Sequence, residues 1–109
     1  MTITTRDVGQ AMIVEVDGDV DLGTSRELRR MLFAALPQAS TLALNLQSIR
    51  YIDSSGIATL IEVLKDSQRL NKHFVLFGLS SAVEEVFRLT HVIRIFKIVR
   101  TEQEAVGMA

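Results

Sequence analysis

The chain has 109 residues without a cysteine, and its 12 Lys and Arg residues nearly balance its 13 Asp and Glu residues. This length suits one domain with its own core. The lack of cysteine excludes disulfides and thiolate metal sites, and the balanced charge offers no basic field for nucleic acid. No apolar run approaches the roughly 20 residues that span a bilayer, and the N-terminus lacks the pattern of a signal peptide. We expect a single cytoplasmic domain, residues 1–109, without membrane or nucleic-acid partners.

The N-terminal segment predicts a pair of strands. β-branched residues dominate 2–6, and apolar residues alternate with other residues over 12–17. Between them, Val8-Gly9-Gln10 is typical of a tight turn, so the two strands should be antiparallel. Residues 18–21 (GDVD) then close the second strand and begin a loop.

A helix is predicted after this loop. Thr24 stands where a capping residue belongs, and Glu27 three residues later would complete a capping box. Pro37, the only proline, should end the helix, because its ring cannot continue the hydrogen-bond ladder. The apolar residues of this helix share one face: Leu28, Met31, Leu32, Ala35 and Leu36.

The middle of the chain predicts one strand followed by a long helix. Residues 41–46 form an apolar strand, and an amphipathic helix runs from about 55 to 70 with its apolar residues on one stripe. Asn71 is well placed to take the left-handed conformation that ends a helix. Residues 51–57 (YIDSSGI) lie at the junction between the two elements.

The C-terminal third continues the alternation. Residues 73–77 are continuously apolar after His73, which is typical of a strand covered on both faces. Ser80 or Ser81 should cap a third helix, and a strand over about 94–99 and a short amphipathic segment over 101–106 follow. The order β-β-α-β-α-β-α-β-α predicts an α/β sandwich with a mostly parallel central sheet, an N-terminal antiparallel strand pair and crossover helices.

The junction at residues 51–57 combines hydroxyls and a carboxylate at a predicted helix start. Asp and Ser accept hydrogen bonds from the free N–H groups of a first turn, and the helix dipole stabilises an anion there. Gly56 lacks a Cβ and would let another backbone approach closely. Such a place can carry, receive or lose a phosphate, although Asp or Ser before a helix often serves only as a cap.

The inventory of side chains does not favour an enzyme. The only histidines are His73 and His91, which we expect at a strand entrance and in a loop. Ser54 lacks the Gly-x-Ser-x-Gly elbow of serine hydrolases because Ile52 stands where the first glycine belongs. The sequence has neither a Walker-type phosphate loop nor a Gly-x-Gly-x-x-Gly motif. We expect no catalysis and no cofactor.

Three segments carry a resemblance to a known family. Residues 18–21 (GDVD), 51–57 (YIDSSGI) and 77–83 (FGLSSAV) resemble, in this order, segments of the STAS-domain anti-sigma-factor antagonists of bacterial partner-switching modules. The resemblance covers nearly the whole chain. Asp19 replaces the family's more usual Glu, and residues 70–72 lack the Gly pair that often precedes the next strand.

The resemblance implies a regulatory switch. Such proteins bind an anti-sigma factor that is also a serine kinase, and thereby release a sigma factor. The kinase uses its bound ATP to phosphorylate the first serine of the motif, here Ser54, which ends binding, and a serine phosphatase restores it. We expect a monomer or weak dimer. The alternative is a STAS scaffold or transporter-accessory module whose serine contacts a partner without being phosphorylated.

Roles can be assigned to residues on this basis. Ser54 is the expected phosphoacceptor and Ser55 the second candidate, while Asp53 either caps the helix or orients the hydroxyl. Asp21 and Thr24 would flank Ser54 at the same edge of the sheet. Ile57 could equally be a core residue. The expected partner surface comprises Asp21, Thr24, Asp53, Ser55, Gly56, Ile57, Thr59, Leu79, Ser80 and Ser81.

Overall fold

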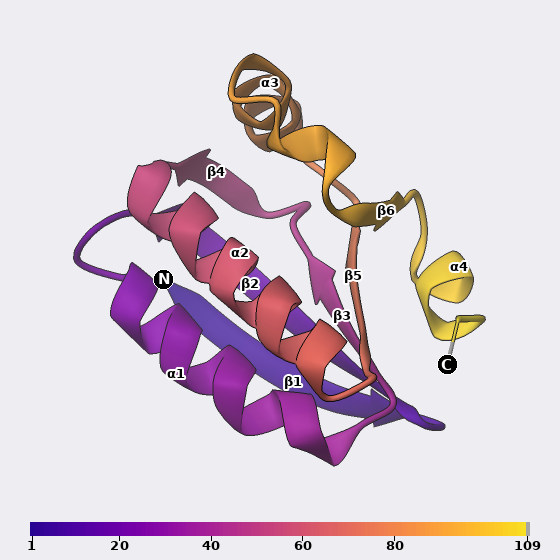
Figure 1. Ribbon diagram of the computed structural model, residues 1–109. Helices are drawn as coiled ribbons and strands as arrows, with labels where there is room; N and C mark the ends of the chain where they lie inside the picture. Colours follow the sequence, from indigo (N-terminus) through magenta and orange to yellow (C-terminus); the bar gives the residue numbers. More distant parts are fainter. Residues whose placement is uncertain (109) are drawn as a thin grey trace.

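Six strands form one mixed sheet in the computed structural model, which describes residues 1–108 (Figure 1). The strand order is β1-β2-β3-β5-β6, and β4 pairs with the far end of β2. β1 is antiparallel to β2 and the other pairs are parallel, which confirms the predicted α/β class. The strands are β1 (Thr2–Val8), β2 (Ala11–Val20), β3 (Thr41–Asn45), β4 (Ile49–Ile52), β5 (His73–Phe77) and β6 (Lys97–Val99).

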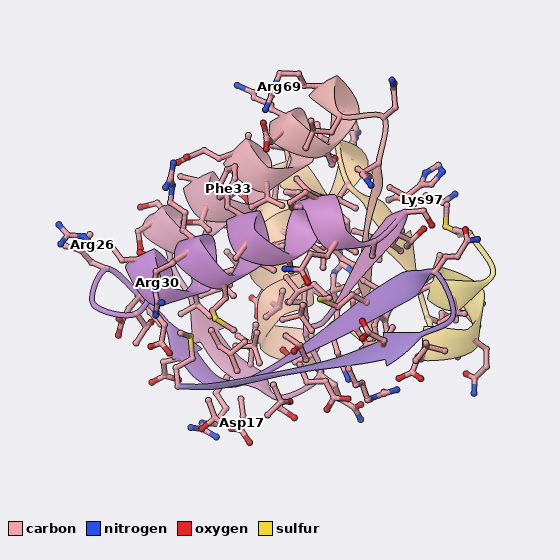
Figure 2. All side chains as sticks on the ribbon, turned by 90° about the horizontal axis from the view of Figure 1, so that it is seen from below. Asp17, Arg26, Arg30, Phe33, Arg69 and Lys97 are labelled. Atoms are coloured by element: carbon pink, nitrogen blue, oxygen red, sulfur yellow. The ribbon has the colours of Figure 1, made fainter. Side chains whose placement is uncertain are left out.

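Helices cover both faces of this sheet. α1 and α2 lie side by side on one face, and α4 lies on the opposite face (Figure 1). Arg26 of α1 and Arg69 of α2 project from the helical layer (Figure 2). The helices are α1 (Ser25–Ala35), α2 (Ser54–Arg69), α3 (Ser81–Leu89) and α4 (Glu102–Val106), with short 3-10 turns at η1 (Leu36–Gln38) and η2 (Val92–Arg94).

The central strands contribute to a core on each face. Leu42 and Leu44 of β3 pack into the larger cluster beneath α1 and α2. Ala43 of β3 and Val75 of β5 point the other way and pack with Ala105 of α4. Because successive side chains of a strand alternate between faces, a strand buried on both faces has a continuously apolar sequence.

Strand β4 was absent from the predicted order. Its two middle residues, Arg50 and Tyr51, are both exposed, so its four residues do not show the alternation that predicts a half-buried strand. The strand forms because β2 has ten residues and extends beyond β3, leaving a length of β2 free to pair with β4. The register shifts between Gly18 and Asp19, where Gly18 has a φ of 120°. Tertiary pairing, rather than local propensity, makes this strand.

The predicted capping box at α1 does not form. The helix begins at Ser25, as expected after Thr24, but Thr24 has φ −109° and ψ −18° and makes no side-chain cap hydrogen bond. An N-cap residue normally has an extended backbone, which directs its side-chain oxygen toward the free N–H groups of the first helical turn. Here the Thr24 hydroxyl bonds within the preceding loop instead.

Two other helix ends were predicted correctly, and one strand was not. Asn71 has a φ of 56°, and the Ser80 hydroxyl accepts a hydrogen bond from the N–H of Val83, so Ser80 is the cap of α3. The last strand begins at Lys97 rather than near Arg94, because η2 ends at Arg94 and Ile95 still has helical backbone angles.

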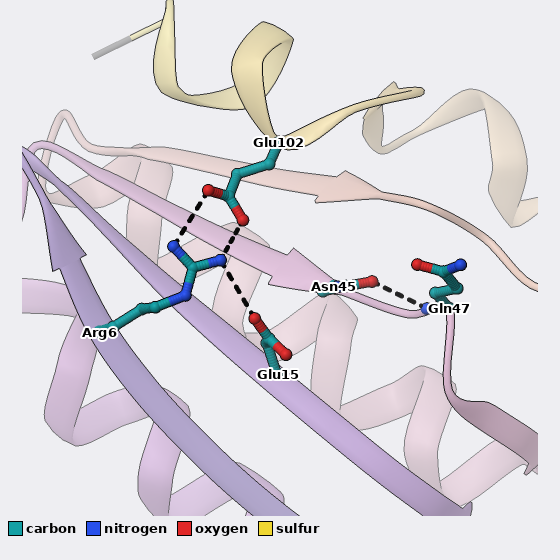
Figure 3. A network of polar contacts seen from close by, with 5 residues as sticks. All are labelled: Arg6, Glu15, Asn45, Gln47 and Glu102. Carbon is teal, nitrogen blue, oxygen red and sulfur yellow. Dashed lines mark hydrogen bonds and ion pairs between the residues drawn. The ribbon is translucent and has the colours of Figure 1, made fainter.

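A polar network attaches α4 to the sheet (Figure 3). The guanidinium group of Arg6 in β1 donates hydrogen bonds to Glu102 at the start of α4 and to Glu15 in β2. The hydrogen bonds from Arg6 lower the pKa of Glu102. Nearby, the Asn45 side chain accepts a hydrogen bond from the N–H of Gln47 at 3.0 Å, which shapes the turn between β3 and β4.

Gly56 sets how closely α2 approaches β2 and β4. A Cβ at this position would lie 2.7 Å from Cγ1 of Val20 and 2.8 Å from Cγ1 of Ile52. We predict that Gly56→Ala lowers the free energy of unfolding by about 1–3 kcal/mol, the usual effect of overpacking. Urea unfolding measures the change. Gly107→Ala is the control, because its Cβ would come no nearer than 3.4 Å to another atom. A gain in stability for Gly56→Ala would contradict this packing.

Candidate functional site

Three segments meet at the carboxyl end of β4. The N–H of Asp53 donates to the carbonyl of Val20 at the end of β2, at 3.1 Å. The loop after β2 also approaches, since the backbone N–H of Leu22 is among the groups that lower the pKa of the Asp53 carboxylate. Ser54 then begins α2. The loop at 21–24, the end of β4 and the first turn of α2 therefore form one continuous edge.

Asp53 is the cap of α2. Its Oδ1 accepts hydrogen bonds from the N–H of Ser55 at 2.9 Å and from the N–H of Gly56 at 3.3 Å. The same oxygen accepts the Ser55 hydroxyl at 2.5 Å. The Ser55 hydroxyl lowers the pKa of Asp53 most, and the backbone N–H groups of Gly56, Ser55 and Leu22 lower it further. The carboxylate is thus held ionised at the helix N-terminus, where the dipole favours it.

The two adjacent serines have different environments. Ser54 is exposed, and its hydroxyl makes no hydrogen bond within residues 1–108. Ser55 is half-buried and its hydroxyl is committed to Asp53. Of the two roles considered for Asp53, it performs the cap, and the hydroxyl that it orients belongs to Ser55 rather than Ser54.

The loop at 21–24 is held by its own polar groups. Oδ1 of Asp21 accepts from the N–H of Gly23 at 2.9 Å and from the N–H of Thr24 at 3.1 Å. The Thr24 hydroxyl accepts from the N–H of Asp21 at 2.9 Å and donates to the carbonyl of Asp19 at 2.8 Å. Asp21 and Thr24 therefore shape the loop beside Ser54, and both remain only partly exposed.

Gly56, Ile57 and Thr59 do not lie on an accessible surface, which corrects the prediction for Gly56 and Thr59 and confirms the core alternative for Ile57. All three are buried. Gly56 admits the side chains of Val20 and Ile52 rather than another molecule. Ile57 belongs to the core cluster, and the Thr59 hydroxyl donates to the carbonyl of Ser55 at 3.1 Å. They face inward because they occupy the inner face of α2, so their role is packing.

Leu79, Ser80 and Ser81 lie at the other end of β4 from Ser54. The Ser80 hydroxyl donates to the carbonyl of Ile49, the first residue of β4, at 2.8 Å. Ile52 ends that strand about 10 Å further along at roughly 3.3 Å per residue, and Ser54 lies two residues beyond Ile52. The length of β4 therefore separates Ser80 from Ser54, and the place of Leu79, Ser80 and Ser81 at the partner surface stays a prediction.

Two exposed apolar side chains in the segments that lead to Ser54 were not among the predicted site residues. Leu22 is 77% exposed and Tyr51 is 51% exposed. Tyr51 pairs with Asp19 across the β2–β4 ladder. Leu22 could have been noticed as an apolar residue inside a polar loop, whereas Tyr51 required knowledge of β4. Leu22 gives the loop at 21–24 an exposed apolar side chain. Tyr51 points to the opposite face of β4 from Ile52, which packs against Gly56 of α2.

The described residues contain neither a cluster of metal ligands nor a helix that could cross a membrane. Among residues 1–108, no group of three or more His, Asp or Glu side chains is arranged to hold a metal ion. His73 is the exposed first residue of β5, and His91 follows α3. No helix within the same range is long and apolar enough to cross a bilayer.

Comparison with known proteins identifies the family. The model of the STAS domain matches residues 2–105. The anti-sigma-B factor antagonist of Listeria monocytogenes is 27% identical over 93 residues, which is 84% of this chain and 82% of the relative. An anti-sigma factor antagonist from Mycobacterium paratuberculosis has a similar fold, with a TM-score of 0.88, 19% identity and coverage of 98% of this chain and 92% of the other. The phosphorylated form of the Bacillus cell fate determinant SpoIIAA superposes with a TM-score of 0.74 and 17% identity, covering 98% of each chain. The chain belongs to the STAS domain family.

Proposed function

We propose that this chain is an anti-sigma factor antagonist, a regulatory binding protein whose contact with its partner is controlled at Ser54. The unphosphorylated chain binds an anti-sigma factor at the edge formed by the loop at 21–24, the end of β4 and the start of α2. The partner's serine kinase activity transfers phosphate from its bound ATP to Ser54, which ends binding, and a serine phosphatase reverses the transfer. The hydroxyl of Ser54, which is exposed and unpaired within residues 1–108, is the observation that carries this proposal.

Relatives support the proposal in two ways. The Listeria protein that matches most of this chain is named an anti-sigma-B factor antagonist. A protein with the same fold has been solved in a phosphorylated form. A hydroxyl that a kinase modifies must reach the kinase without unfolding the substrate, and Ser54 meets this requirement at the first residue of α2.

A phosphate on Ser54 would extend into solvent from a helix that is already capped. Asp53 occupies the N–H groups of Ser55 and Gly56, and the N–H of Ile57 bonds the carbonyl of Asp53. The helix dipole and the N–H of Ser54 remain to favour the added charge of roughly −1.5 to −2. The antagonist therefore need not rearrange, and the disruption falls on the complex.

The change in charge is large enough for a switch. A hundredfold loss of affinity corresponds to about 2.8 kcal/mol. Burying a new dianion at an interface without a cationic partner easily exceeds this. The exposed Leu22 in the loop at 21–24 offers apolar area that a partner can cover, so the phosphate would be introduced into a closed, partly desolvated contact.

The phosphoacceptor can be identified directly. With an extract of the native cell and ATP, the purified protein should gain a single phosphate, and Ser54→Ala should abolish it because Ser54 is the proposed acceptor and the neighbouring Ser55 hydroxyl is bonded to Asp53. Phosphopeptide mass spectrometry measures the site. Ser81→Ala should retain the label, although Ser81 is also the exposed first residue of a helix. Label that persists in Ser54→Ala would refute the assignment. Partner capture without any label would favour the scaffold alternative.

A permanent negative charge should separate binding from folding. We predict that Ser54→Asp weakens capture of the partner by at least about tenfold, since it carries part of a phosphate's charge. The melting temperature should move by less than about 2 °C, because Ser54 is exposed and an acidic residue suits a first turn.

Binding measurements and thermal melts of the same samples test this prediction. Gln103→Glu, which adds one charge to the first turn of α4 on the opposite face of the sheet, is the control and should bind normally. If Ser54→Asp unfolds the domain, the hydroxyl is structural and the proposed switch is wrong.

A further inference from the structure

We propose that Asp53 determines which of the two adjacent serines accepts the phosphate, because its carboxylate holds the Ser55 hydroxyl and leaves that of Ser54 free. Asp53 is thus a positioning residue for selectivity as well as a helix cap. This inference rests on the proposed function and adds to it the reason why one of two neighbouring hydroxyls is modified.

The geometry distinguishes the two hydroxyls sharply. Ser55 Oγ lies 2.5 Å from Oδ1 of Asp53, a short hydrogen bond to an ionised acceptor, which is the strong kind. The N–H of Ser55 donates to the same oxygen at 2.9 Å, so backbone and side chain of Ser55 are held together. The carbonyl of Ser55 is also engaged, by the Thr59 hydroxyl at 3.1 Å. Ser54 has no such side-chain contact within residues 1–108 and is exposed.

Helix geometry adds a directional difference. Successive residues of an α-helix are rotated by roughly 100° about the axis. A kinase that binds the edge with its ATP aligned on the Ser54 hydroxyl would therefore have to bind in a different orientation to phosphorylate Ser55. The half-buried position of Ser55 makes that second approach less open.

The transfer itself requires a free hydroxyl. The serine oxygen forms a bond to the γ-phosphorus of ATP, the bond from that phosphorus to the bridging oxygen breaks, ADP leaves, and the hydroxyl proton passes to a base. For Ser55 to react in the kinase, the hydrogen bond from its hydroxyl to Asp53 must first break. For Ser54, the kinase supplies the base and nothing in the antagonist has to be broken.

The opposite role for Asp53 would be to promote phosphorylation of Ser55. A carboxylate bonded to a serine hydroxyl could act as the base that activates Ser55. The hydrogen bonds to Asp53 lower its pKa, and a carboxylate with a lowered pKa is a weaker proton acceptor. The three groups that hydrogen-bond the carboxylate all donate to it, so they oppose its protonation. The structure therefore favours restraint of Ser55 over activation.

The test compares phosphorylation sites in variants of the full chain. Asp53→Gly removes the carboxylate but keeps a residue that is accepted at helix caps. With native cell extract and ATP, the wild type should be labelled at Ser54. In Asp53→Gly the ratio of Ser55 to Ser54 label should rise about tenfold or more, the factor that one charge-assisted hydrogen bond provides. Ser54→Ala should remain unlabelled, whereas Asp53→Gly/Ser54→Ala should gain label at Ser55.

Asp53→Asn is the matched control. Its amide oxygen can still accept the Ser55 hydroxyl and both N–H groups, so selectivity for Ser54 should be kept without the charge. An NMR measurement on the unphosphorylated protein supplies a readout independent of the kinase. The Ser55 hydroxyl proton should exchange slowly with water in the wild type and rapidly in Asp53→Gly, while circular dichroism verifies that each variant is folded.

Each contrary result has a distinct meaning. Label on Ser54 of the wild type with an unchanged site ratio in Asp53→Gly overturns the selectivity role and leaves the proposed function intact. Loss of all label from a folded Asp53→Gly variant also overturns it, because Asp53 would then be needed for recognition. Wild-type label on Ser55 that disappears in Asp53→Asn would make Asp53 the base. No label on the wild type overturns the proposed function and this inference together.

Discussion

The hydrogen bonds to the Asp53 carboxylate are the constraint on which the rest of the site depends. One oxygen accepts two backbone N–H groups and one hydroxyl from the first turn of α2. The backbone of Asp53 at the same time continues the pairing of β4 with β2. A single residue therefore joins a strand, a helix and the loop beside them, and it fixes the position from which Ser54 faces outward.

A rigid platform of this kind suits a switch that works by charge alone. Gly56 brings the inner face of α2 against Val20 and Ile52, and Ile57 anchors the same turn in the core. The first turn therefore has little freedom to absorb a phosphate by moving. A charge added to Ser54 would therefore act on the partner bound at this edge, because the first turn of α2 cannot easily rearrange to accommodate it.

Much of the fold could be predicted from the sequence because central strands and amphipathic helices have clear periodicity. The continuous apolar pattern of β5, the left-handed Asn71 and the Ser80 cap all follow from local rules. β4 could not be predicted in this way, since its exposed Arg50 and Tyr51 reflect pairing with the far end of β2. Thr24 failed as a cap for a related reason, because the loop competes for its hydroxyl.

The site was predicted less completely than the fold. The identity of the helix cap and the place of Ser54 at a helix start could be inferred from the motif at 51–57. Which residues face inward could not, because the motif does not say which side of the first turn contacts β2. The commitment of the Ser55 hydroxyl to Asp53 was likewise invisible in sequence, since either serine could have been the one that the carboxylate binds.

The most direct test of the account is the affinity of one partner for two forms of the same protein. The partner captured from the native cell extract is purified and titrated by calorimetry with the unmodified protein and with protein phosphorylated at Ser54. The account predicts a loss of affinity of about a hundredfold or more on phosphorylation, with unchanged circular dichroism of the antagonist. Equal affinity for both forms would contradict it.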